Sequence, residues 1–323
     1  MPKARVLLLG ATGETGGDIL DGLLADGSFD VDCLIQPSSA SKPSVQSLKD
    51  RGLKIVIGNL TGTVDDLVDV IKGYDTIISA IGATQQQTQI KLVDAAAKVA
   101  VKRFVPCGFT IVCPPGGVMS IRDDKEEVYQ RIWYHHLPYT IIDVGYWHQI
   151  SWPRLPSGRL DYAMLRPQTE IYGDGNAPSI LTDKRDIGHF VALIIKDERT
   201  LNKKVFTYSD VLSQNQIVSV MEEKSGEKVE WSYISEEELL KRREKARAEY
   251  VADPTNLATR MMRSITEYSV AKYIRRDNTP ENGKYLGYLD ARRLYPDFKP
   301  IRFVDFVDEL LAGKAQRPYV GRF

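Results

Sequence analysis

Apolar runs and amphipathic segments alternate along the first half of the chain. Each apolar run is short and uninterrupted, which is typical of a parallel strand buried on both faces. In the segment after the first run, Ile19, Leu20 and Leu23 recur at helical spacing. This predicted helix ends at Gly27. The predicted strands are 5–10, 31–35, 53–60, 75–82, 102–108 and 138–145, and further predicted helices are 64–73, 89–100 and 125–136.

Strands that alternate with helices predict a parallel sheet with helices on both faces. We therefore expect an α/β protein with a doubly wound sheet. The chain has 323 residues, a length that suits one large domain and a smaller one. Residues 186–195 predict a helix that returns to the large domain, and 203–209 and 228–235 predict strands. Residues 236–250 and 255–274 predict two further helices.

The first predicted strand leads into the glycine-rich stretch "GATGETGG", residues 10–17. Gly10 permits a tight turn out of the strand, Gly13 lets the backbone approach a pyrophosphate, and Gly16 lets the helix pack closely on the sheet. The free N–H groups that open the helix then face the phosphates. In this strand–turn–helix context the motif predicts a dinucleotide site, and the alternative is a purely structural turn.

The end of the second predicted strand indicates which dinucleotide is bound. An NAD site places an acid about 20 residues after the glycines, but this position holds Gln36. Asp32 lies earlier in the strand, toward the wrong edge of the sheet. Ser38, Ser39 and Lys42 follow Gln36 and can receive a 2′-phosphate. We therefore expect NADP rather than NAD, with a plain polar loop as the alternative.

At several motifs the chain resembles the isoflavone reductase and NmrA-like group of atypical short-chain dehydrogenases, most closely its fungal members. The matching stretches are "GATGETGG", "PSSASK", "GLKIVIGNLTG", "KRFVPCGF", "LPYTIIDVG" and "DIGHF". The resemblance implies a Rossmann-like domain that binds NADPH over residues 1–150, with 184–208 returning to it. It also implies a smaller, discontinuous α/β domain over 151–323 that covers the substrate.

The resemblance also implies which residues contact NADPH/NADP. The family usually carries an arginine where this chain has Gln36, and a serine and an acid where it has Cys107 and Gly108. A neutral amide grips a 2′-phosphate more weakly than a guanidinium fork does. The implied cofactor contacts are Gly10, Thr12, Gly13, Glu14, Thr15, Gly16, Gln36, Ser38, Ser39, Lys42, Ser79, Ala80, Ile81, Cys107, Lys125 and Tyr146.

The catalytic residue implied by the resemblance is Lys125. Thirteen positions separate it from Pro138 of "LPYT", which is the family's spacing. An ammonium near the nicotinamide ribose can set the cofactor's pose, stabilise an oxyanion or exchange a proton. The alternative is a solvated lysine among acidic neighbours. A Tyr-x-x-x-Lys motif like that of ordinary short-chain dehydrogenases occurs at Tyr268 and Lys272, which we interpret as a helix face of the small domain.

Aromatic residues follow the sixth predicted strand, where open α/β sheets place their ligands. Tyr146, Trp147, His148 and Trp152 are therefore expected to bind a flat, largely apolar substrate. Packing between the two domains is the alternative. A single histidine such as His148 is more often structural than catalytic.

Composition narrows the possible functions. The chain has 43 basic and 43 acidic residues, so nothing indicates nucleic acid or an anionic membrane as a partner. Its three cysteines and four histidines show no metal-binding spacing, and the cysteines are expected to be reduced. The N-terminal apolar run is too short for a membrane span, so a cytoplasmic protein is expected. A homodimer stays open.

The sequence predicts an NADPH-dependent reductase of a hydrophobic aromatic or polycyclic metabolite, of the kind found in fungal secondary metabolism. Two alternatives stay open. The first is a redox-neutral isomerase or cyclase that uses NADP(H) to tailor a natural product, because the usual catalytic tyrosine is missing. The second is a non-catalytic NADP sensor that binds a partner protein, although such a sensor has no need of Lys125.

Overall fold

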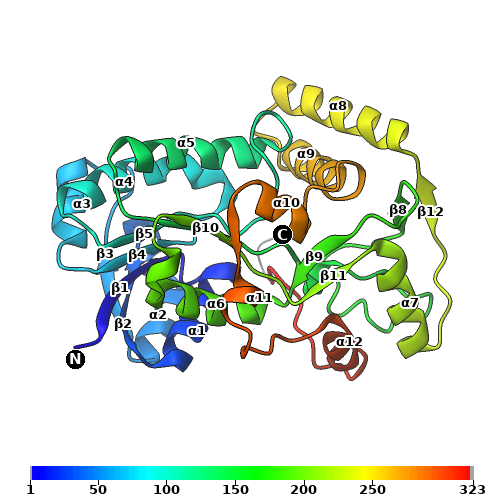
Figure 1. The fold of residues 1–323 in the computed structure, drawn as a ribbon, viewed down its shortest axis with the longest axis horizontal. Coiled ribbons are helices and arrows are strands. Elements are labelled where there is room, and N and C mark those ends of the chain that lie inside the picture. Colours follow the sequence, from blue (N-terminus) through cyan, green and yellow to red (C-terminus); the bar gives the residue numbers. More distant parts are fainter. Residues whose placement is uncertain (1, 321–323) are drawn as a thin grey trace.

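The computed structural model describes residues 2–320 and has a parallel sheet at its centre (Figure 1). The strands run in the order β3-β2-β1-β4-β5, so the chain starts in the middle of the sheet and builds outward in both directions. This is the strand order of a doubly wound fold. The strands are β1 (Ala4–Leu9), β2 (Phe29–Ile35), β3 (Lys54–Ile57), β4 (Thr76–Ser79) and β5 (Arg103–Val105).

The sheet continues beyond β5 through one parallel bridge between Phe104 and Tyr139. The next strand, β6, pairs in parallel with β10, and β10 pairs in parallel with β13. Segments far apart in the sequence therefore extend the first sheet. These strands are β6 (Thr140–Asp143), β10 (Lys203–Phe206) and β13 (Tyr288–Asp290).

Helices cover both faces of the sheet, as the alternating pattern predicts (Figure 1). Adjacent residues of β1 pack on opposite faces of the sheet. Leu8 belongs to the core beneath α1, α2 and α6. Leu7 belongs to the core beneath α3, α4 and α5. Both leucines are fully buried, and each burial contributes about 2 kcal/mol. The helices are α1 (Glu14–Asp26), α2 (Pro43–Asp50), α3 (Val64–Ile71), α4 (Gln89–Lys98), α5 (Ser120–Tyr134) and α6 (Lys184–Lys196).

Helices α1 and α6 cross at a pair of glycines. A Cβ atom added to Gly22 would lie 2.1 Å from the backbone carbon of Gly188. Only two residues without side chains permit this approach, which holds α6 against the helix that follows the glycine-rich turn.

Most of the remaining elements lie to the right of the central sheet in the view of Figure 1. They form two small sheets, β11-β9-β7 and β12-β8, and a third apolar core between α7, α12 and Trp152. The strands are β7 (Tyr146–Trp147), β8 (Glu170–Tyr172), β9 (Ser179–Thr182), β11 (Asp210–Leu212) and β12 (Ser232–Ile234). The helices are α7 (Gln214–Ser225), α8 (Glu236–Ala252), α9 (Leu257–Ser269), α10 (Pro280–Tyr285), α11 (Ala291–Leu294) and α12 (Phe303–Leu311).

The predicted fold class is confirmed, and two local predictions are corrected. Helix α5 begins at Ser120 rather than at 125, because its first inward-facing residue is the charged Arg122, which interrupts the apolar period. No helix was predicted between residues 35 and 53, but this stretch contains a 3₁₀ turn, Pro37–Ser39, and helix α2. The division between domains at residue 150 stays a prediction.

Candidate active site

The glycine-rich turn lies between the ends of β1 and β4. Gly10 has φ of +83°, and a Cβ atom there would lie 2.2 Å from the carbonyl oxygen of Ala80. A Cβ atom on Gly16 would lie 2.0 Å from the carbonyl oxygen of Gly10. Both positions therefore require glycine for the turn to form. Gly13 has an ordinary extended backbone and caps α1 without a side-chain hydrogen bond.

The acid within this turn is neutralised by a lysine from α6. Lys184 lies 3.2 Å from the carboxylate of Glu14 and 3.0 Å from that of Asp18. Burial raises the pKa of Asp18 to about 7. Glu14 also accepts a hydrogen bond of 2.8 Å from the backbone N–H of Tyr319. The next helical residue, Thr15, is half-buried, and Thr12 lies in the turn itself.

The end of β2 presents polar groups without a carboxylate. Gln36 and Ser39 are half-buried, and Ser38 and Lys42 are exposed, in the turn between β2 and α2. Asp32 lies elsewhere: it is buried, and it faces Lys54 at 3.1 Å. The geometry therefore leaves a polar edge that suits a 2′-phosphate, next to the glycine-rich turn.

Lys125 is buried at the carboxyl ends of β4 and β5. Its ammonium donates a hydrogen bond of 2.6 Å to the carbonyl oxygen of Cys107 and one of 3.4 Å to Oε1 of Gln86. Only 3% of the residue is exposed, which excludes the solvated lysine that was the alternative. Burial lowers the pKa of Lys125, and the positive charge of Arg122 adds to this effect.

The segment after β5 links Lys125 to the glycine-rich turn. The Cys107 thiol donates to the carbonyl oxygen of Ile81, which follows Ser79 and Ala80 at the end of β4. A Cβ atom on Gly108 would lie 2.5 Å from the carbonyl oxygen of Ile142. An acid at this position would therefore force the two segments apart, which explains why glycine stands here.

A buried ion pair, which the sequence did not reveal, fixes the strand ends around Lys125. Arg122 lies 2.6 Å from Asp143 at the end of β6, and both side chains are fully buried. Arg122 also donates to the carbonyl oxygen of Ile111, and the hydroxyl of Tyr288 donates to Asp143. Removing one partner of such a pair leaves an uncompensated charge and costs about 3–5 kcal/mol.

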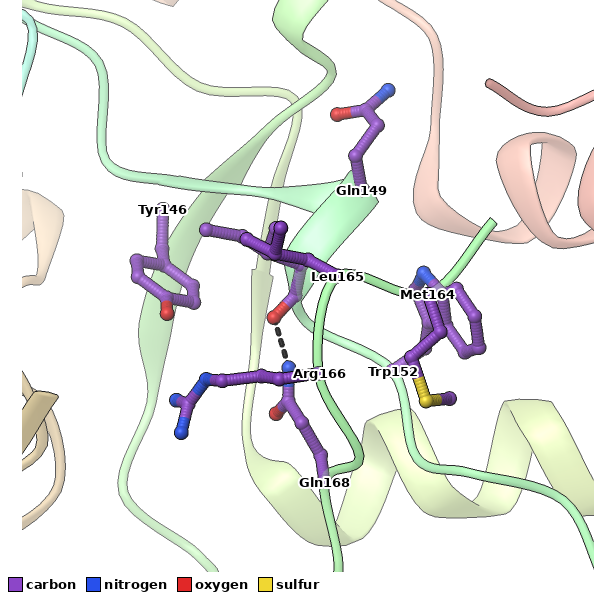
Figure 2. A pocket seen from close by; sticks show the side chains of 8 residues that line it. Tyr146, Gln149, Trp152, Met164, Leu165, Arg166 and Gln168 are labelled. Carbon is purple, nitrogen blue, oxygen red and sulfur yellow. Dashed lines mark hydrogen bonds between the residues drawn. The ribbon is translucent and has the colours of Figure 1, made fainter. Parts of the chain in front are cut away.

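The aromatic residues after β6 divide between two environments. Tyr146 and Trp152 line a small cavity of about 40 Å³, together with Gln149, Met164 and Arg166 (Figure 2). This volume holds little more than a water molecule, so a drug-sized substrate needs the cavity to open.

Trp147 and His148 do not line this cavity, and their role as substrate contacts stays a prediction. The Trp147 ring stacks on Tyr319 with centroids 5.8 Å apart. His148 is fully buried, and its Nε2 lies 2.9 Å from the hydroxyl of Ser209. Burial lowers the pKa of His148 to about 4, so the ring is neutral at pH 7. Both side chains pack inside the protein, as their structural alternative stated.

The Tyr-x-x-x-Lys segment lies in the small helices, as expected, but it faces the site. The hydroxyls of Tyr268 and Thr110 lie 2.7 Å apart, and the Tyr268 ring centroid lies 6.1 Å from that of Tyr146. The ammonium of Lys272 lies over the Tyr146 ring, 3.1 Å from the ring centroid. No sequence pattern indicates this position, because only tertiary packing brings the end of α9 against Tyr146.

Arg166, Met164 and Leu165 are further cavity residues that the sequence did not single out. They lie in a segment without regular secondary structure between the 3₁₀ turn His148–Ile150 and β8. No periodic pattern marks such a segment, so its side chains carry no sequence signal for a site.

The chain is similar in sequence to curated reductases and dehydrogenases. The chain is 41% identical over 313 residues to asnovolin J 5′,6′-dehydrogenase of Aspergillus novofumigatus, covering 96% of each chain. It is 30% identical to a phenylcoumaran benzylic ether reductase of Pinus taeda, covering 96% of this chain and 98% of the relative.

Solved structures show the same fold. A leucoanthocyanidin reductase–NADPH complex from Vitis vinifera superposes with a TM-score of 0.80 at 24% identity, covering 96% of this chain and all of the other. The structure of AtPrR2 with NADP+ and (+)pinoresinol superposes with a TM-score of 0.76 at 25% identity, covering 95% and 99%. Residues 2–276 match the profile of the NmrA-like family, and the chain therefore belongs to the NmrA-like family, as the sequence motifs predicted.

Proposed function

We propose that the protein is an NADPH-dependent oxidoreductase that reduces a hydrophobic aromatic or polycyclic metabolite. The observation that carries this proposal is the position of Lys125, a buried ammonium at the strand edge that also holds the glycine-rich turn. The named relatives are reductases and a fungal dehydrogenase, which supports net redox chemistry.

The residues present fit NADPH. The turn at Gly10 and Gly16 leaves no room for side chains, and α1 begins without a side-chain cap, so its N–H groups suit a pyrophosphate. The hydroxyl of Ser79 is buried without a hydrogen-bond partner within residues 2–320. Ser38, Ser39 and Lys42 surround the place for the 2′-phosphate, where no carboxylate opposes it. NADPH supplies a hydride when bound.

Lys125 is the candidate catalytic residue. Its ammonium is already held by the Cys107 carbonyl and Gln86, so its position is fixed without a substrate. The third contact of the ammonium is a weak hydrogen bond of 3.8 Å to the Cys107 sulfur, which a substrate oxygen or a ribose hydroxyl would replace. Since burial lowers its pKa, Lys125 can also release a proton more readily than a surface lysine. It would thus stabilise an oxyanion or protonate it.

The walls around Tyr146 select the substrate. Trp152, Met164 and Leu165 offer apolar surface, whereas Arg166 offers a polar group to the same cavity (Figure 2). This mixture suits a flat apolar molecule that carries a few oxygens. Trp147 and His148 are buried in the protein and do not line this cavity.

The redox-neutral and sensor alternatives have less support, because the named relatives are reductases and dehydrogenases. Cytoplasmic localisation and a homodimer remain predictions from the sequence. Within residues 2–320, no helix is long and apolar enough to span a membrane.

Transfer of deuterium tests the proposed function. The protein would be incubated with NADPH deuterated at C4 and a panel of flat aromatic and polycyclic ketones, enones and benzylic ethers. We expect one panel member to gain a single deuterium, detected by mass spectrometry, with one NADPH oxidised for each product. Product without deuterium and without NADPH oxidation would support the redox-neutral alternative instead.

A further inference from the structure

Two cationic side chains from separate segments meet at Tyr146. Lys272 places its ammonium 3.1 Å from the centroid of the Tyr146 ring and is only 3% exposed. Arg166 is half-buried and lines the cavity, with its guanidinium beside the Tyr146 hydroxyl (Figure 2). The charge of Arg166 acts on both Tyr146 and Lys272.

No carboxylate of the described chain balances these two cations. Within residues 2–320, neither Arg166 nor Lys272 forms a salt bridge, and the hydrogen bond of Lys272 goes to the hydroxyl of Tyr273 at 3.1 Å. The nearby acid on β8, Glu170, is paired with Arg242 at 2.8 Å.

The other ionisable groups around Lys272 are phenols. Tyr146 and Tyr273 contact its ammonium, and Tyr172 stacks on Tyr273 with centroids 5.5 Å apart. Burial raises the pKa of all three phenols, so they carry no negative charge at pH 7. Burial and the positive charge of Arg166 lower the pKa of Lys272.

This arrangement is costly for the protein alone. A buried ammonium without a counter-ion loses its hydration, and a neighbouring guanidinium adds repulsion. Lys272 also lies in a π-helical turn, Val270–Ile274, at the end of α9. Such turns are rare and frequently lie at functional sites. Two basic side chains beside a cavity, with no carboxylate of residues 2–320 paired to either, therefore indicate that a ligand supplies the missing anion.

We propose that Arg166 and Lys272 bind an anionic oxygen group of the substrate, a carboxylate or an enolate, beside Tyr146. This inference rests on the proposed function and narrows its substrate class to hydrophobic acids. The guanidinium and ammonium donate charge-assisted hydrogen bonds to the anion, while Trp152, Met164 and Leu165 contact the apolar body. The anion lowers the cost of burying Lys272 in its charged form.

A pair of matched probes tests this site. Isothermal titration would measure the affinity of the NADP⁺-loaded protein for 2-naphthoate and for its neutral isostere, 2-naphthamide. We expect 2-naphthoate to bind about tenfold more tightly or better. Lys272→Met and Arg166→Gln should each remove most of this preference and leave 2-naphthamide affinity within about threefold. Lys203→Met, at an exposed lysine on β10, should change neither affinity.

Thermal unfolding separates a binding role from a structural one. Because Lys272→Met removes an uncompensated buried charge, we expect its melting temperature to be equal to or above that of the wild type. Equal affinities for the two probes, no saturable binding of 2-naphthoate to the wild type, or a melting temperature lowered by Lys272→Met would overturn the proposal. NADP⁺ is titrated first, so a failure of cofactor binding is recorded separately and counts against the proposed function.

Discussion

The ammonium of Lys125 donates a hydrogen bond of 2.6 Å to the carbonyl oxygen of Cys107. This contact ties the second turn of α5 to the segment that leaves β5, at the edge of the sheet where the glycine-rich turn also lies. Lys125 is thereby held in a fixed, buried position at this edge. Under the proposed function, this position would bring its ammonium to the nicotinamide.

Cofactor preference depends on the end of β2. We expect the protein to bind NADPH more tightly than NADH, because no acid opposes a 2′-phosphate near Gln36. Gln36→Arg should tighten NADPH binding by about tenfold at low salt, since a guanidinium replaces a neutral amide. The gain should shrink as salt screens the charges. Titration with both cofactors measures it, and an equal gain for NADH would contradict this assignment.

Gly13 tests the place of the pyrophosphate. Its backbone is extended, with φ of −86°, so a side chain there strains no dihedral angle. Gly13→Val should nevertheless abolish NADPH binding, because the branched side chain would occupy the space that the pyrophosphate needs. Circular dichroism should show an intact fold. Retained NADPH affinity would mean that this glycine serves only the turn.

Gly16 and Gly17 form a matched pair for stability. A Cβ atom on Gly16 would lie 2.0 Å from a backbone oxygen, whereas one on Gly17 would lie 3.7 Å from its nearest neighbour. Gly16→Ala should therefore destabilise the fold by about 3 kcal/mol or more, and Gly17→Ala should change it by less than about 1 kcal/mol. Urea unfolding of both variants measures the difference. Similar stabilities would contradict the close packing of α1 on its turn.

His148 predicts a pH dependence of stability. Its folded-state pKa of about 4 lies below its ordinary value of 6.5, so the unfolded chain binds the proton first as pH falls. The stability that neutral His148 contributes is complete above pH 6.5 and is lost as pH falls toward 4. Between about pH 7.5 and about pH 5, the free energy of unfolding should fall by about 2 kcal/mol more in the wild type than in His148→Gln.

Urea unfolding at the two pH values gives both free energies. An identical pH dependence in wild type and His148→Gln would show that the ring is not buried in its neutral form. The comparison also tests whether His148 is a substrate contact, since a ring exposed to solvent in a binding site would keep an ordinary pKa.

Much of the fold could be predicted because its strands are buried on both faces. Leu7 and Leu8 are both apolar although they face opposite sides, which is the pattern of a covered parallel sheet. The start of α5 was missed because Arg122 occupies an inward position. Its charge is matched by Asp143 from another strand, and no local pattern records such a long-range pair.

The candidate cofactor residues follow one another in short motifs at strand ends, so the sequence suffices to propose them, and their contacts stay predictions. The lining of the cavity could be predicted only for Tyr146 and Trp152, because its other residues come from irregular segments. Tyr268 and Lys272 illustrate this limit: the sequence places them on a late helix, and only packing brings them to Tyr146. Trp147 and His148 follow Tyr146 in sequence, but their side chains are buried, which the position after a strand end does not reveal.

The rate of hydride transfer in a Lys125→Met variant tests the central claim most directly. Methionine fills a buried site without the ammonium, and Lys72→Met on the surface provides the control. With saturating NADPH and the substrate found by deuterium transfer, we expect Lys125→Met to slow transfer by about 10²-fold or more and Lys72→Met to leave it unchanged. A Lys125→Met rate within about threefold of wild type would contradict the account.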